Sequence, residues 1–115
     1  MLKPLITMIS GRGVSTEDAE LVAETLGISV HALCDQFALE IAQGYMSGEY
    51  SWEFGDVAMN GLYASAYAVG DFGLPDFAMH VYEAFDEGEY VHSRQRELDG
   101  KPRTKALLAP LLPNA

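Results

Sequence analysis

Residues 52–69, WEFGDVAMNGLYASAYAV, are the stretch that decides the fold. After Asp56 no charged residue occurs until Asp71, and the interval is rich in large side chains, namely Met59, Leu62, Tyr63, Tyr67 and Val69. Ser51 is placed to cap the start of a helix, and Gly70 can adopt the left-handed conformation that ends one. The pattern predicts a buried central helix. The uncharged run is shorter than the about 20 apolar residues of a membrane span, so we expect no membrane insertion.

The composition indicates one globular domain over residues 1–115. Hydrophobic residues make up 49% of the 115, which argues against disorder. The single cysteine, Cys34, cannot form an intramolecular disulfide, which suits a reducing compartment. The N-terminal MLKPLITMIS is interrupted by Pro4 and lacks a cleavage pattern. We therefore expect a cytoplasmic protein.

The charge is divided between an acidic body and a basic tail. The net charge is -10, and fifteen Asp and Glu residues but no Lys or Arg lie between Arg12 and Arg94. Five of the seven basic residues then fall within 94–105, so residues 91–103 are predicted to form an exposed basic loop. An acidic surface repels nucleic acid and most membranes and attracts basic proteins. The alternative is that the charge serves solubility and that the tail folds back on the body.

Residues 18–37, DAELVAETLGISVHALCDQF, resemble the core of a helix-turn-helix. Ser15 is placed to cap the first helix, Gly27 to end it, and Ser29 to precede the second helix. Ala23, Gly27 and Leu33 match the spacing of that family. The resemblance implies DNA binding through the second helix in the major groove.

The basic residues of that family are missing here. The positions that would face bases or phosphates carry no Arg or Lys; they are Val30, His31, Asp35 and Gln36. Phosphate contacts supply most nonspecific affinity for DNA. We therefore expect a helical hairpin used for packing or for protein contacts, and nucleic acid is disfavoured as a ligand.

An internal repeat relates residues 35–50 to residues 75–90. The aligned segments, DQFALEIAQGYMSGEY and PDFAMHVYEAFDEGEY, share five identities in sixteen positions at a spacing of 40 residues. The pattern predicts two similar amphipathic helices, each ended by a glycine at Gly48 or Gly88, which pack on either side of the central helix. The fold class is therefore predicted to be all-α, a compact bundle of about five helices.

The second copy of the repeat carries the densest acidic patch and the candidate partner-binding residues. These are Tyr82, Glu83, Asp86, Glu87, Glu89 and Tyr90. A metal site formed by His80, Glu83 and Glu87 has plausible helical spacing, but a solvated helix face is the favoured interpretation. Cys34 and His31, one turn apart, suggest a thiolate pair, against which we favour a buried inert cysteine. We predict no catalytic residue, no metal and no cofactor.

The segment 74–92, LPDFAMHVYEAFDEGEYVH, is also similar to segments of small uncharacterised bacterial proteins, which implies an acidic helical protein of bacterial origin. Beyond it, Leu107, Leu108, Leu111 and Leu112 must be covered either by this core or by another subunit, so a homodimer stays open.

The leading hypothesis is a protein-interaction module of the inhibitor, immunity or antitoxin kind. Its Glu/Asp/Tyr face would bind a basic protein partner. The first alternative is a helix-turn-helix regulator whose basic tail supplies phosphate contacts. The second alternative is a small metal-dependent enzyme.

Overall fold

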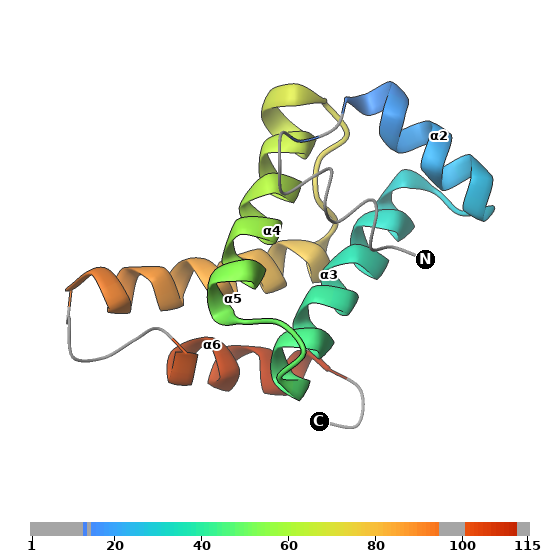
Figure 1. The fold of residues 1–115 in the computed structure, drawn as a ribbon. Helices are drawn as coiled ribbons and strands as arrows, with labels where there is room; N and C mark the ends of the chain where they lie inside the picture. The colour runs from blue at the N-terminus through green and yellow to red at the C-terminus, as the bar shows by residue number, and fades with distance from the viewer. Residues whose placement is uncertain (1–12, 14, 95–100, 113–115) are drawn as a thin grey trace.

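The computed structural model describes residues 13, 15–94 and 101–112, with the side chains of 88–94, 101 and 102 left undescribed. In these ranges the chain forms five α-helices and no strand, which confirms the predicted all-α bundle (Figure 1). The helices are α2 (Thr16–Leu26), α3 (Val30–Ser47), α4 (Trp52–Ala64), α5 (Asp76–Arg94) and α6 (Lys101–Leu108). A π-helical turn, η1 (Ser65–Val69), continues α4, and a 3₁₀ turn, η2 (Ala109–Leu111), follows α6. Of the described helices, none combines the length and the apolar character that a membrane crossing requires.

Serine side chains begin the first three helices, as the sequence predicts. Ser15, Ser29 and Ser51 accept backbone N–H groups at distances of 3.2, 3.0 and 3.1 Å, respectively. Each bond satisfies one of the N–H groups that have no partner in the first turn of a helix. These helix starts are therefore fixed locally by the sequence.

Two glycines end α2 and α3 in the left-handed conformation, Gly27 with φ of 73° and Gly48 with φ of 88°. Gly70 follows the last residue of η1, so the predicted end of the helix is confirmed, but the predicted left-handed conformation is wrong, because its φ is -115°. Gly70 is instead needed for close packing. A Cβ atom there would lie 2.6 Å from the carbonyl oxygen of Ser65 and 2.8 Å from Oγ1 of Thr16.

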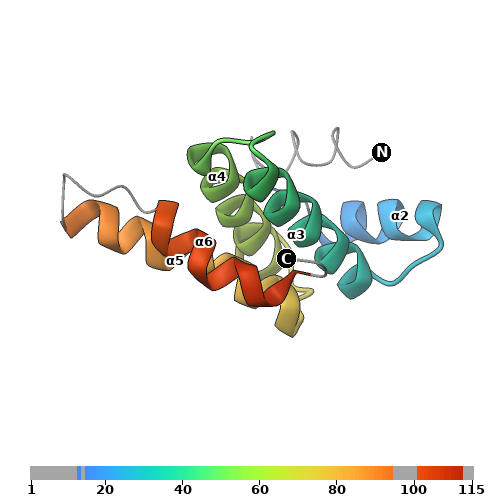
Figure 2. The same ribbon diagram turned by 90° about the horizontal axis from the view of Figure 1, so that it is seen from below.

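The centre of the molecule is formed by α3, α4 and α5, which contact one another in all three pairings. Figures 1 and 2 show α2 at one end of this group and α6 alongside α5. The largest fully buried side chains of the centre include Phe37, Ile41, Met59, Val81 and Phe85. Gly55 lets Phe85 approach α4 closely, since a Cβ at Gly55 would lie 2.5 Å from Cε1 of that ring.

The predicted central helix is present as α4 and η1, which together span residues 52–69. Met59 and Leu62 are buried in it as predicted. The expectation is wrong for Tyr63, Tyr67 and Val69, whose side chains are exposed. The reason is geometric, because α3 and α5 both cover the side of α4 that carries its buried residues. The prediction that the two repeat helices pack on either side of the central helix is therefore wrong.

The two copies of the internal repeat form α3 and α5, and equivalent positions face the core in both. Buried pairs are Ala38 with Ala78, Ile41 with Val81, and Tyr45 with Phe85. The copies diverge at the glycine, because Gly48 ends α3 whereas α5 continues through Gly88 to Arg94. The predicted stop at Gly88 is therefore wrong. A glycine inside a helix costs only about 1 kcal/mol, and α6 packs along α5.

The predicted loop over residues 91–103 is wrong at both of its ends. Residues 91–94 belong to α5 and residues 101–103 to α6, while 95–100 lie outside the described residues. α6 is anchored in the core by Thr104 and Leu108, both with no exposed surface.

The core of the same chain covers the four leucines that follow Thr104. Leu108 belongs to the buried core cluster, and Leu107, Leu111 and Leu112 pack against it. These leucines therefore give no reason to expect a second subunit.

Candidate functional site

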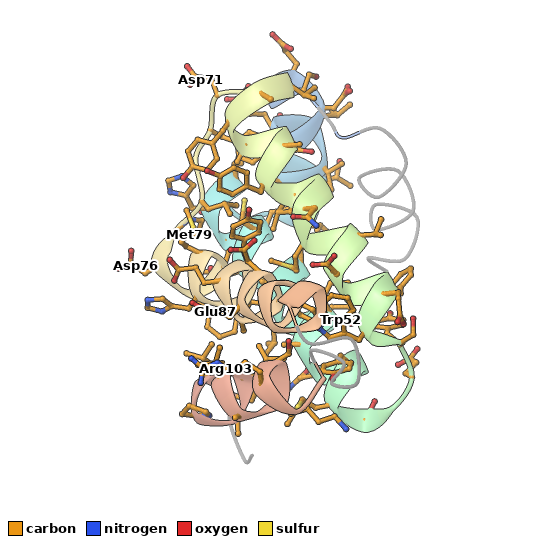
Figure 3. All side chains as sticks on the ribbon, turned by 90° about the vertical axis from the view of Figure 1, so that its left-hand side faces the viewer. Trp52, Asp71, Asp76, Met79, Glu87 and Arg103 are labelled. Atoms are coloured by element: carbon orange, nitrogen blue, oxygen red, sulfur yellow. The ribbon has the colours of Figure 1, made fainter. Side chains whose placement is uncertain are left out.

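The outer side of α5 carries a row of exposed carboxylates. Buried Ala78, Val81, Ala84 and Phe85 define the inner side of this helix. With 3.6 residues per turn, the opposite side presents Asp76, Glu83, Asp86 and Glu87, all of which are exposed. We call these four side chains the acidic face. Figure 3 shows Asp76 and Glu87 on α5, with Arg103 on the neighbouring α6.

The structure describes the side chains of four of the six predicted partner-binding residues. Glu83, Asp86 and Glu87 belong to the acidic face, and Tyr82 is half-buried beside it. Glu89 and Tyr90 lie within the range of α5, but their side chains are outside the described residues.

The basic side chains of α6 that the structure describes do not neutralise the acidic face. Arg103 and Lys105, the two basic residues whose side chains the structure describes, are exposed and form no ion pair with Glu83, Asp86 or Glu87. The ammonium of Lys105 instead lies 5.6 Å from the centre of the Tyr45 ring. Arg103 and Lys105 therefore leave these carboxylates available to another molecule.

Three tyrosines from α4, η1 and α5 form a continuous group next to the acidic face. The rings of Tyr63 and Tyr82 are stacked, with centres 4.4 Å apart and planes 18° apart. The ring of Tyr67 is tilted by 47° against Tyr63 at 4.9 Å. Tyr63 is 37% exposed and Tyr67 is 49% exposed. We call this group the tyrosine row.

The sequence pattern predicts Tyr82 in the site but Tyr63 and Tyr67 in the core. A usable signal was present, because tyrosines four residues apart share one side of a helix. Their hydroxyl groups also favour a position where one end of the ring stays in contact with water or a polar partner. That signal was outweighed by the absence of charge in this segment.

The polar residues of the helix-turn-helix segment contact their own chain. Oδ1 of Asp35 accepts the backbone N–H of Ala78 at 3.2 Å and thereby caps the start of α5. Nε2 of His31 lies 2.7 Å from the carbonyl oxygen of Phe72, so this nitrogen donates a hydrogen bond. Of the four predicted groove-facing residues, Val30 and Asp35 are half-buried, whereas His31 and Gln36 are exposed.

The other chemical candidates gain no support from the geometry. Within the described part of the chain, no group of three His, Cys, Asp or Glu side chains is arranged to hold a metal ion. Burial, followed by the nearby charge of Asp35, raises the pKa of Cys34 to about 12. The thiol is therefore protonated at neutral pH, and His31 is engaged elsewhere.

Comparison with known proteins gives no match: no protein-family model, no curated protein and no solved structure is significantly similar to this chain. The resemblance of residues 74–92 to small bacterial acidic proteins therefore stays a prediction.

Proposed function

We propose that this protein is an acidic protein-interaction module of the inhibitor, immunity or antitoxin kind, acting in the bacterial cytoplasm on a basic protein partner. The observation that carries the proposal is the juxtaposition of the acidic face with the tyrosine row. Asp86 lies one helical turn beyond Tyr82, so that a carboxylate and an aromatic ring share one side of α5. Both belong to the exposed or half-exposed surface.

The two parts of this surface supply different components of binding. Carboxylates that form no ion pair with Arg103 or Lys105 create a negative potential, which steers a basic partner and raises its association rate. Tyrosines are enriched among the few residues that dominate binding energy, because they bury a large area with only two rotatable side-chain bonds. Binding through such a surface weakens as salt screens the charges over about 10 Å.

A helix-turn-helix regulator is the second candidate, because α2 and α3 are joined by a turn of three residues in the manner of that motif. In such a protein the phosphate contacts would come from the basic residues between 94 and 105. The test is a mobility shift of random duplex DNA at low salt. The absence of any retardation would remove this candidate.

The leading proposal is tested by affinity capture from a lysate of the source organism, followed by washes at low and at high salt and mass spectrometry. Three forms of the full chain are compared: wild type, the variant Glu83→Lys/Asp86→Lys/Glu87→Lys, and a matched control. The control is Glu17→Lys/Glu20→Lys/Glu24→Lys, which reverses three exposed charges on α2 and changes the net charge equally. Circular dichroism verifies that each variant is folded.

The proposal predicts that one basic protein is retained by wild type and by the α2 variant, leaves at high salt, and is missing from the α5 variant. Equal retention by the α5 variant would contradict the proposal. Equal loss from both variants would also contradict it, because the binding would then depend on total charge and not on this surface.

A further inference from the structure

The tyrosine row limits which kind of basic side chain fits this surface best. Its three rings lie side by side at the border of the acidic face, and two of them are about two-fifths to one-half exposed. We propose that the tyrosine row receives arginine side chains of the basic partner, so that the site selects arginine over lysine. This inference rests on the proposed function and names the chemistry of its partner.

The preference for arginine follows from the shape of the two cations. A guanidinium group is flat and weakly hydrated, so it stacks on an aromatic ring while its N–H groups still reach a carboxylate. Asp86, one turn from Tyr82, offers such a carboxylate within the same patch. The ammonium of lysine is compact and strongly hydrated, so it gains less from a ring face.

The rings are held in place before any partner arrives. The hydroxyl oxygen of Tyr67 accepts the backbone N–H of Leu74 at 3.0 Å, which fixes the outer ring of the row. Tyr63 is held between Tyr67 and Tyr82 by ring contacts on both sides. Side chains that are already ordered lose little further entropy on binding, so more of the stacking energy remains as affinity.

A second copy of this chain is a poorer occupant of the same surface. A two-fold contact would bring two identical patches together, each with Glu83, Asp86 and Glu87 exposed. Like charges placed opposite each other oppose association. An arginine-bearing segment complements both the charge and the rings.

The test compares hexa-arginine with hexa-lysine, two peptides of equal charge, in calorimetric titrations of the full chain at low salt. Wild type is expected to bind hexa-arginine about threefold to tenfold more tightly, as stacking on partly exposed rings allows. The variant Tyr63→Leu/Tyr67→Leu is expected to bind both peptides equally. The variant Tyr63→Phe, which keeps the ring face and leaves the hydrogen bond of Tyr67 in place, is expected to retain the preference.

The outcomes separate this inference from the proposed function. Equal affinity of wild type for both peptides, or a preference that survives Tyr63→Leu/Tyr67→Leu, would overturn the arginine inference. The proposed function would stand in that case if Glu83→Lys/Asp86→Lys/Glu87→Lys abolished binding. If the variant Glu83→Lys/Asp86→Lys/Glu87→Lys bound both peptides as tightly as wild type does, the proposed function itself would be contradicted.

Sedimentation of the peptide-free protein supplies one further outcome. A concentration-dependent dimer that Tyr63→Leu/Tyr67→Leu dissolves would overturn the arginine inference, because it would assign the tyrosine row to a second copy of the chain.

Discussion

Thr104 is the residue that joins three helices through hydrogen bonds. Its hydroxyl oxygen accepts the indole N–H of Trp52 at 2.9 Å and donates to the carbonyl oxygen of Ala84 at 3.0 Å. The hydroxyl is fully buried, so water cannot replace either bond. These two bonds therefore help to fix the position of α6 against α4 and α5, together with the buried Leu108.

We predict that Thr104→Val lowers the free energy of unfolding by about 1–3 kcal/mol, because it removes the buried hydroxyl that accepts the indole N–H of Trp52 and donates to Ala84. Urea denaturation followed by circular dichroism measures this change. The control is Thr25→Val, which removes an exposed hydroxyl bonded to the carbonyl oxygen of Leu21 and should change stability by less than about 0.5 kcal/mol. Equal effects of the two substitutions would contradict the role given to Thr104.

Glycine is required at position 55 because of side-chain packing and not because of its backbone conformation. Alanine would gain about 1 kcal/mol in helix propensity, but its Cβ would lie 2.5 Å from the buried ring of Phe85. We predict that Gly55→Ala destabilises the protein by about 1–3 kcal/mol in thermal or urea unfolding. In a Phe85→Leu background the penalty should shrink. A penalty of the same size in both backgrounds would refute the steric explanation.

The reactivity of the Cys34 thiol reports how well the folded core excludes reagents from this side chain. It is 1% exposed, and burial raises its pKa to about 12, far above the ordinary value of 9.0. The reactive thiolate is therefore suppressed in the folded protein at pH 8, whereas an unfolded chain exposes an ordinary thiol. We predict that an aromatic disulfide reagent modifies Cys34 only as fast as the protein unfolds. Modification at the rate of a free cysteine would show that the side chain is accessible.

At the scale of the elements, α3 and α5 are coupled by a cap that crosses between helices. Asp35 on α3 accepts the N–H of Ala78 in the first turn of α5, across 43 residues of sequence. We predict that Asp35→Ala destabilises the protein by about 0.5–2 kcal/mol, as the loss of a helix cap does. Asp35→Asn keeps an acceptor oxygen and should retain most of the stability. Chemical denaturation measures the stability of the two variants. Equal losses of stability in Asp35→Ala and Asp35→Asn would contradict the role of Asp35 as a helix cap.

The features predicted correctly from the sequence are those fixed within a few residues. Ser15, Ser29 and Ser51 bind N–H groups three positions later, and Gly27 ends α2 by its own backbone conformation. Each of these helix starts and ends can therefore be predicted from a few neighbouring residues.

The features that were missed depend on which helices pack together. Tyr63 and Tyr67 were assigned to the core because their segment lacks charge, but the neighbours of α4 cover only one of its sides. The bonds of Thr104 to Trp52 and Ala84 span 52 and 20 residues, respectively. A pattern within a short stretch of sequence cannot predict contacts between residues that are so far apart along the chain.

At the scale of the whole molecule, negative charge and aromatic surface coincide on the side formed by α4 and α5. α2 is also acidic, with exposed Glu17, Asp18, Glu20 and Glu24, but it packs on α3 and η1 at the other end. Figures 1 and 2 show this separation of α2 from α6 and the C-terminal half of α5. The two acidic surfaces therefore allow the charge of α5, which lies beside Tyr82, to be compared with the charge of α2.

The most direct test of the proposed site is a nuclear magnetic resonance titration of the isotope-labelled full chain with hexa-arginine at low salt. We predict that the largest amide shift changes fall at Tyr63, Tyr67 and residues 82–87, with small changes over residues 17–24. Shift changes concentrated in α2, or spread evenly over both acidic surfaces, would contradict the assignment of the binding site to α4 and α5.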